Sequence, residues 1–300
     1  MDPSSVRALP EVGVEPSVSP QADTVRLFVR RLGRNRLAKG GVVIVATVVA
    51  IALVGPLIAP HDPNFQYAGE RLGAPSSRFP LGTDSFGRDL LSRLLHGARP
   101  SVGLATAATF IIVSIGVLVG TWAGYLGGRA DDVAMRVVDI LLAFPNLILA
   151  LAVVGALGPG LLNVVIGVSA TAWAGYARVV RGIVLSERER GYVQAAIALG
   201  ANNRTVVFGH LIPSVVAPVV VLATLQMGGL ILTIAGLSFL GLGAQPPDAE
   251  WGAMLNQGRQ FFQLEPQLMI YPGIMIAITV LGFNLLGDGL RDVLDPRTGR

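Results

Sequence analysis

The sequence predicts an all-α membrane protein, a polytopic bundle of six transmembrane helices with one charged helical loop between two of them. Mean hydropathy is +0.62, and 52% of the residues are hydrophobic while only 14% are charged. A water-soluble globular domain does not have this composition. Several uncharged runs also reach the roughly 20 residues that a helix needs to cross a hydrocarbon core of ~30 Å. The bilayer is therefore the expected solvent for most of the chain.

Each expected span occupies one of these uncharged runs. The third and fourth spans share one long run, because Gly158-Pro159-Gly160 favours a chain reversal inside it. Pro145 and Pro218 remove backbone hydrogen bonds and predict kinks in the third and fifth spans. The six spans are expected at residues 41–59, within 100–128, twice within 137–177, at 214–240 and at 269–286.

The spans divide the chain into five parts. The longest hydrophilic piece between spans contains Asp89, Leu90, Leu91, Leu94 and Leu95, a spacing that predicts an amphipathic helix lying on the outer membrane surface. The expected organisation is a partly disordered cytoplasmic tail at 1–39, a first transmembrane helix at 40–60, an external loop with this amphipathic segment at 61–99, the main transmembrane domain at 100–290 with the charged loop at 186–213, and a cytoplasmic tail at 291–300.

Basic residues orient the predicted bundle. Lys and Arg in short loops favour the cytoplasmic side of a membrane. With a cytoplasmic N-terminus and six spans, 17 of the 23 Lys and Arg residues fall on that side. Both termini and the charged loop at 186–213 are therefore expected in the cytoplasm.

The composition excludes several kinds of chemistry. The chain has no Cys, so disulfides, thiol catalysis and cysteine-ligated metals are excluded. His61, His96 and His210 are widely separated, and we expect neither a metal site nor catalytic residues. A phosphate-binding loop of the form GxxxxGK(S/T) does not occur, so this chain has no nucleotide site of that type. The pI of about 9.9 reflects topology; nucleic acid is not an expected partner, because no basic face alternates with aromatic residues.

The charged loop contains local helix signals. Ser186 with Glu189 three residues later is typical of a capping box and predicts a helix that begins near Glu187. Gly200 has the residue type that most readily closes a helix in the left-handed conformation. Asn202 or Asn203 can cap a second short helix, which we expect to end before Pro213.

The same loop carries a family resemblance. Gln194-Ala195-Ala196, Gly200 and Ile212-Pro213 resemble the EAA loop of binding-protein-dependent ABC importer permeases, although the usual leading Glu is Gln194 here and the Asn that often follows the closing Pro is Ser214. Further motifs resemble the C-type permease subunit of dipeptide and oligopeptide importers over about residues 25–298; they include Pro80-Leu81-Gly82-Thr83-Asp84, Gly87-Arg88-Asp89, Ala123-Gly124-Tyr125, Leu237-Ser238-Phe239-Leu240-Gly241-Leu242-Gly243 and Leu294-Asp295-Pro296-Arg297. A Glu common in that family before the last glycine-rich motif is Ile234 here.

The resemblance implies a type I ABC importer fold in the bacterial cytoplasmic membrane, with no cofactor in this chain. The implied partners are membrane lipid, a second permease subunit, two ATPase subunits that bind ATP and Mg²⁺, and an extracytoplasmic substrate-binding (lipo)protein. The charged loop would act as a coupling helix in a groove of an ATPase subunit. Its implied contact residues are Glu189, Tyr192, Val193, Gln194, Ala195, Ala196, Gly200, Ala201, His210 and Pro213.

Polar residues within the spans are candidates for a translocation path, because such side chains are costly in lipid and tend to face the protein interior or water. They are Asn146, Gln226, Thr233 and Asn284, and interhelical hydrogen bonding is the alternative role. Asp139, one turn from Arg136, predicts an ion pair on the helix surface.

Two further groups have structural or docking interpretations. Gly116, Gly120 and Gly124 recur every four residues and predict close packing of a neighbouring helix. The external loop at 241–267 either contacts a binding protein or only plugs the bundle; the candidate contact residues are Trp251, Arg259, Phe261 and Phe262.

The function that the resemblance implies is ATP-driven import of di- or oligopeptides. The same architecture could instead import nickel, a metal chelate or glutathione. A self-contained channel or secondary transporter is a third class, which predicts a charged relay at mid-membrane; the sequence does not contain one.

Overall fold

The computed structural model describes residue 33 and residues 35–294, the side chain of Leu294 excepted. The expected tail at residues 1–39 therefore lies mostly outside the described residues, as do residues 295–300 of the expected C-terminal tail. Within the described part the chain contains helices and one isolated β-bridge between Thr83 and Asp89. The predicted all-α fold class is confirmed.

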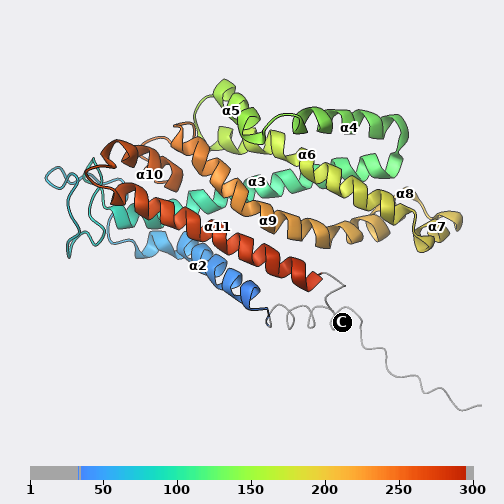
Figure 1. Ribbon diagram of the computed structural model, residues 1–300, viewed down its shortest axis with the longest axis horizontal. Coiled ribbons are helices and arrows are strands. Elements are labelled where there is room, and N and C mark those ends of the chain that lie inside the picture. The colour runs from blue at the N-terminus through green and yellow to red at the C-terminus, as the bar shows by residue number, and fades with distance from the viewer. Residues whose placement is uncertain (1–32, 34, 295–300) are drawn as a thin grey trace, which may run out of the picture.

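The helices form an elongated bundle (Figure 1). Residues 61–89 and α10 lie at one end, which we call the cap, and α7 and α8 lie at the opposite end, which we call the hairpin. In chain order the elements are α2 (Arg36–Ile58), α3 (Leu90–Leu126), α4 (Gly128–Leu142), α5 (Asn146–Leu157), α6 (Leu161–Arg188), α7 (Gly191–Ala198), α8 (Asn203–Val206), the π-helical turn η1 (Val207–Leu211), α9 (Ile212–Phe239), α10 (Trp251–Gly258), the 3₁₀ turn η2 (Arg259–Phe261) and α11 (Gln267–Leu294).

Four of the predicted spans are long, apolar helices in the structure: α2, α3, the continuous helix Asn203–Phe239 and α11. The third predicted span is the bent pair of α4 and α5. The fourth is α6, whose 28 residues are long enough to cross a bilayer. Asn163, Trp173 and Arg178 make α6 less apolar than the other spans, and its extensive packing against α3 explains why it needs less lipid-compatible surface.

The third span was expected to be one kinked helix, but it is broken. α4 and α5 meet at 90°, and Ala143, Phe144 and Pro145 separate them. Pro145 cannot donate a backbone hydrogen bond, and its ring would clash with the carbonyl of the preceding turn. Its own carbonyl accepts from Ile148, which starts α5. α9, in contrast, continues through Pro218.

The amphipathic segment predicted to lie on the membrane surface is not a separate helix. Asp89 caps α3 by accepting from the backbone N–H of Ser92 at 3.1 Å, so the segment forms the first turns of that 37-residue helix. Leu90 and Leu94 are buried. The prediction was wrong because the apolar stripe faces α10 and α2 instead of lipid headgroups.

The glycine repeat of α3 packs against α6, as predicted. A Cβ added at Gly116 would lie 2.4 Å from the Cβ of Tyr176, and one at Gly120 would lie 2.5 Å from the carbonyl oxygen of Ala177. At Gly124 the nearest atom is the Cβ of Val184, at 3.0 Å. Any side chain at the first two positions would force the helices apart.

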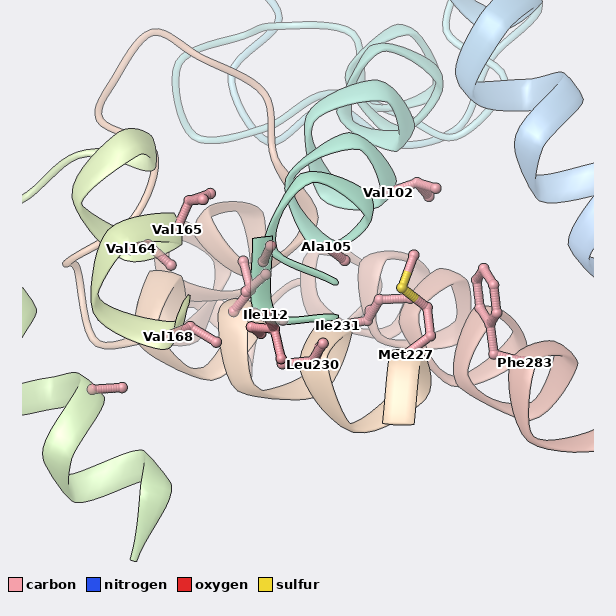
Figure 2. Close-up of a cluster of buried hydrophobic side chains, with 14 of the residues drawn as sticks. Val102, Ala105, Ile112, Val164, Val165, Val168, Met227, Leu230, Ile231 and Phe283 are labelled. Carbon is pink, nitrogen blue, oxygen red and sulfur yellow. The ribbon is translucent and has the colours of Figure 1, made fainter. Parts of the chain in front are cut away.

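The main hydrophobic core draws buried side chains from most of the helices, and α3, α6, α9 and α11 are among them. Figure 2 shows Ile112 of α3, Val168 of α6, Ile231 of α9 and Phe283 of α11 gathered around one buried cluster. Helices far apart in the sequence therefore meet near the centre of the bundle, between the cap and the hairpin.

Candidate functional site

The hairpin begins later in the chain than the sequence indicates. Ser186 lies in the last turn of α6, which runs to Arg188, and α7 begins only at Gly191. The predicted capping box is therefore wrong. α6 continues because Val184 packs against Gly124 of α3 and because Glu187 is buried with partners of its own. Tertiary packing overrides the local capping signal.

The turn after α7 agrees with the prediction. Gly200 has φ +84°, a conformation that favours glycine. The N–H of Gly200 donates to the carbonyl of Ile197, and the N–H of Ala201 donates to that of Ala196, both at 3.0 Å. This pair of bonds defines a Schellman motif, so Gly200 ends the helix as expected.

Asn202, and not Asn203, caps the second helix. Its side-chain oxygen accepts from the backbone N–H and from the hydroxyl of Thr205, each at 2.8 Å. This helix does not end before Pro213, because η1 joins α8 to α9 without interruption. Pro213 lies in the first turn of α9, and the π-helical turn before it loosens the backbone where the proline ring would crowd the carbonyl four residues earlier.

Glu187 fixes the hairpin to α6, and the sequence analysis did not single it out. Its buried carboxylate pairs with Nε of Arg190 at 3.1 Å and accepts a hydrogen bond from the hydroxyl of Tyr192. That hydrogen bond raises the pKa of the Tyr192 phenol above its usual value. The ring of Tyr192 also meets His210 edge-on, with ring centroids 5.7 Å apart. The sequence signal that could have identified Glu187 is its position near the end of a long helix, five residues before Tyr192.

The predicted coupling residues divide between anchors and exposed positions. Val193 is fully buried, while Ala196, Ala201 and His210 are half-buried. Gln194 is exposed, and its amide donates to the carbonyl of Arg188 at 2.8 Å. The other exposed members of the set are Glu189, Tyr192, Ala195, Gly200 and Pro213.

Two large apolar side chains that the prediction missed are among the most exposed in the hairpin region. Leu199 is 89% exposed and Phe208 is 68% exposed. Leu199 follows the last residue of α7 and directly precedes the left-handed glycine, and Figure 1 shows α7 at the end of the bundle opposite the cap. The hairpin is therefore anchored from beneath by Val193 and Glu187 and presents an apolar tip.

The four path candidates are not gathered into one site. Asn146, Gln226 and Asn284 are exposed, and Thr233 is half-buried with its hydroxyl donating to the carbonyl of Gly229 in its own helix. Only Asn284 lines the hollow of about 660 Å³ between α9 and α11. Its other lining residues are apolar or small, among them Leu232, Ala235, Phe239, Gly273, Ile276 and Ala277.

Trp251 packs inside the cap and cannot contact a binding protein. Its side chain is 0% exposed, and its indole N–H donates to the carbonyl of Leu94 at 3.0 Å. The other three candidates remain accessible: Arg259 and Phe262 are exposed and Phe261 is half-buried. Trp251 directly follows Glu250, which caps α10. An apolar side chain in that position indicates packing inside the protein and not contact with a binding protein.

The cap contains buried charges with partners in the same chain. Arg88 pairs with Asp84 at 2.7 Å and donates to Gln257 of α10 at 2.8 Å. Arg93, which is 1% exposed, donates to the carbonyls of Pro63 and Pro247 at 3.0 and 3.2 Å. The bond from Arg88 to Gln257 ties residues 61–89 to α10, and Arg93 ties the start of α3 to Pro63 and Pro247.

Charged pairs also join α4 to α6. Asp139 pairs with Arg178 of α6, whereas a pair with Arg136 in its own helix was predicted. Asp131 makes a two-armed pair with Arg181. The two acids lie on the face of α4 that meets α6, so tertiary contact decides their partners. Among the described residues no group of three or more His, Asp or Glu side chains is placed to hold a metal ion.

This arrangement, a helical membrane bundle with a protruding hairpin between two of its helices, matches a known class of membrane protein. The chain belongs to the family described as the binding-protein-dependent transport system inner membrane component, whose model matches residues 116–300. Residues 24–75 match the N-terminal transmembrane domain of oligopeptide transport permease C. The protein is thus a C-type permease subunit of the peptide-importer group of ABC transporters, in the bacterial inner membrane.

Its relatives carry names for three cargoes. The chain is 43% identical to a glutathione transport system permease of Pectobacterium atrosepticum, over 91% of each chain. It is 42% identical to a di/tripeptide transport system permease of Pseudomonas aeruginosa, over 90% of this chain and 91% of the relative. Identity to a nickel transport system permease of Escherichia coli K12 is 43%, over 85% and 92%. Their similar identities do not separate the cargoes.

Proposed function

We propose that this chain is one of two membrane subunits of an ATP-driven importer of di- or oligopeptides. A homologous permease would complete the membrane pore, an extracytoplasmic binding protein would deliver the peptide, and two ATPase subunits would bind ATP and Mg²⁺. Both termini and the hairpin would lie in the cytoplasm, as the distribution of basic residues indicates.

The hairpin supports the coupling role most directly. It lies at the end of the bundle (Figure 1) and exposes Leu199, which is the kind of apolar anchor that a partner groove buries. Glu187 and Tyr192 fasten α7 to α6, and the continuous helix from Asn203 carries α8 into α9. A push on the hairpin would therefore move α6 and α9 as rigid elements, which alternating access requires.

The hollow between α9 and α11 favours a cargo with variable side chains. Its wall is apolar or small except for the amide of Asn284. Such a surface holds one polar group of a substrate and tolerates differences elsewhere. Because α9 forms one wall and also continues from the hairpin, movement of the hairpin would change the shape of this hollow.

Glutathione or nickel import is the second candidate function, since relatives of equal similarity bear those names. Glutathione is itself a tripeptide and would use the same kind of wall. Nickel carried as a chelate would need no protein ligand.

Uptake by the reconstituted complex distinguishes these cargoes. Proteoliposomes would contain this chain with its second permease, ATPases and binding protein, and a labelled dipeptide would be the probe. Inhibition by unlabelled di- and oligopeptides, but not by Ni²⁺, supports peptide import; competition by glutathione alone or by nickel alone would replace it. Sustained flux through this chain without partners would overturn the importer assignment.

Two substitutions test the hairpin. Ala196→Glu and Gly200→Arg place bulky charge in the expected contact and should uncouple ATP hydrolysis from uptake. Gly103→Ala, at a position of α3 with open space around it, is the control. Unchanged uptake per ATP in both hairpin variants would contradict the coupling role.

The orientation has its own test, because the natural chain lacks Cys. Leu199→Cys should react with a membrane-impermeant thiol reagent only from the cytoplasmic side, and Phe65→Cys in the cap only from outside. The reverse pattern would contradict the proposed topology.

A further inference from the structure

One helix connects the cap with the hairpin. α3 is 37 residues long and at 1.5 Å per residue spans about 55 Å. At its start, the guanidinium of Arg93 is bonded to the carbonyls of Pro63 and Pro247, and the carbonyl of Leu94 accepts from Trp251. The first turns of α3 are therefore fixed to both parts of the cap.

The other end of α3 is fixed to both sides of the hairpin by one residue. The carbonyl of Tyr125 accepts from Nη1 of Arg188, at the end of α6, at 2.9 Å. Its hydroxyl donates to Oδ1 of Asn203, the first residue of α8, at 2.7 Å. Tyr125 thus contacts the helix that enters the hairpin and the helix that leaves it.

A hollow separates α3 from the second of these helices. About 340 Å³ of space lies between the last turns of α3 and the helix from Asn203, lined on one side by Leu118 and Trp122 and on the other by Val207 and Phe208. Tyr125 and Asn203 both line this hollow, and their hydrogen bond joins its two walls. Towards α6, in contrast, α3 is in close contact through its glycines.

We propose that Tyr125 is a positioning residue that links the hairpin to α3, so that α3 carries a displacement of the hairpin to the cap. The proposal rests on the coupling role proposed above. When an ATPase subunit moves the hairpin, the bond to Asn203 makes α3 follow α8 as well as α6. The bonds of Arg93 and Trp251 then deliver this movement to residues 61–89 and α10, at the end where a binding protein would dock.

Tyr125→Phe isolates this link. The variant loses the hydroxyl that reaches Asn203 but keeps the carbonyl that accepts from Arg188 and the ring that lines the hollow. Since one such hydrogen bond shifts an equilibrium by a modest factor, we expect solute taken up per ATP hydrolysed to fall about threefold to tenfold in the reconstituted complex. Stimulation of ATP hydrolysis by the loaded binding protein should fall in parallel, while assembly of the complex is retained.

Two comparisons make the result specific. Tyr271→Phe also removes one hydroxyl from a tyrosine, but this tyrosine of α11 has no hydrogen-bond partner for its hydroxyl among the described residues. The variant should keep the wild-type uptake per ATP. Asn203→Ala should reproduce the loss seen in Tyr125→Phe, and the double variant should be no worse than either single one, because both remove the same interaction.

The outcomes distinguish the role of Tyr125 from the coupling role of the hairpin, on which it rests. If Ala196→Glu uncouples transport but Tyr125→Phe has wild-type uptake per ATP, the hairpin couples and the role of Tyr125 is overturned. Additive losses in the double variant would also overturn it, since the two residues would then act independently. If Ala196→Glu and Gly200→Arg leave transport coupled, the coupling role itself fails.

Discussion

Charged side chains are buried and paired within the chain at the cap, whereas apolar side chains are exposed at the hairpin. In the cap, Arg88 and Arg93 reach Asp84, Gln257 and several backbone carbonyls. In the hairpin, Val193 and Glu187 anchor a surface from which Leu199 projects. The cap therefore holds its shape with contacts inside one polypeptide, and the hairpin surface is one that another protein can complete. α3 joins the cap, which is held by contacts within the chain, to the hairpin, whose surface is open to a partner.

The largest expected effect tests whether the cap supports itself. Arg93→Ala removes the guanidinium and leaves Asp84 and the carbonyls of Pro63 and Pro247 without that donor. Breaking a buried charge network of this kind costs about 3–5 kcal/mol, so the thermal midpoint of the detergent-solubilised protein should fall sharply. Arg259→Ala, an exposed arginine near the same end, is the control. Equal midpoints for the two variants would show that the buried network does not stabilise the cap.

The contact between α3 and α6 joins the two ends and gives the next effect. Gly120→Leu forces a side chain against the carbonyl of Ala177, which lies 2.5 Å from the position of a Cβ. Overpacking of this kind costs about 1–3 kcal/mol, and the midpoint of unfolding should fall accordingly. Gly103→Ala in the same helix meets open space and should leave it unchanged; a Gly120→Leu protein as stable as wild type would contradict close packing here.

A substitution at the hairpin should affect binding more than folding. Leu199→Asp changes a side chain that is 89% exposed, so stability should stay within about 0.5 kcal/mol of wild type. If this leucine is an anchor in an ATPase groove, affinity for that subunit should fall about tenfold or more in a binding assay with purified components. Leu264→Asp changes a leucine near the cap that is 74% exposed, and this variant should bind the subunit normally. If the Leu199→Asp variant bound the ATPase subunit as tightly as wild type, the hairpin would not be the docking end that distinguishes it from the cap.

The smallest effect depends on pH and concerns Glu250, the residue that caps α10. Burial raises the pKa of its carboxyl above the ordinary 4.5, although the backbone N–H groups of Gly252 and Ala253 oppose the shift. Because the folded protein then holds this proton more tightly than the unfolded chain, the associated stability is complete below about pH 4.5 and is lost as the pH rises through the raised value.

Glu250→Gln cannot titrate and keeps one acceptor oxygen, whereas the two N–H groups donate to different oxygens of Glu250. The thermal midpoint of the wild type should therefore fall relative to that of the variant as the pH rises above about 4.5. Parallel profiles for the two proteins would mean that the cap does not hold a protonated acid.

Several features of the fold and the site follow from local signals. The long apolar runs predicted α2, α3, α9 and α11. In lipid every backbone N–H and C=O must be hydrogen-bonded within the protein, and a single segment can meet that requirement only as a helix. Gly200 was predicted correctly because the left-handed conformation is a property of the residue type. The glycine repeat in α3 predicted close packing for a similar reason, although it could not name α6 as the partner.

The incorrect predictions share one cause, which is that a partner distant in sequence decided the outcome. Ser186 and Glu189 have the spacing of a capping box, but the contact of Val184 with Gly124 extends α6 past Ser186 to Arg188. Asp139 pairs with Arg178 and not with Arg136, because α4 lies on α6. Trp251 resembles an exposed docking aromatic in sequence, and its indole is buried because α3 passes next to α10.

The sequence by itself determined that this chain is a helical membrane protein, where most of its spans lie, and that its charged loop forms a helical hairpin closed by Gly200. Hydrophobic run length, residue type and short-range spacing contain that information. Only the tertiary structure decided that Glu187 holds the hairpin, that Leu199 forms its exposed tip, and that Tyr125 meets both Arg188 and Asn203. Those contacts join residues up to 78 positions apart, and no local pattern specifies which helices pack together to create them.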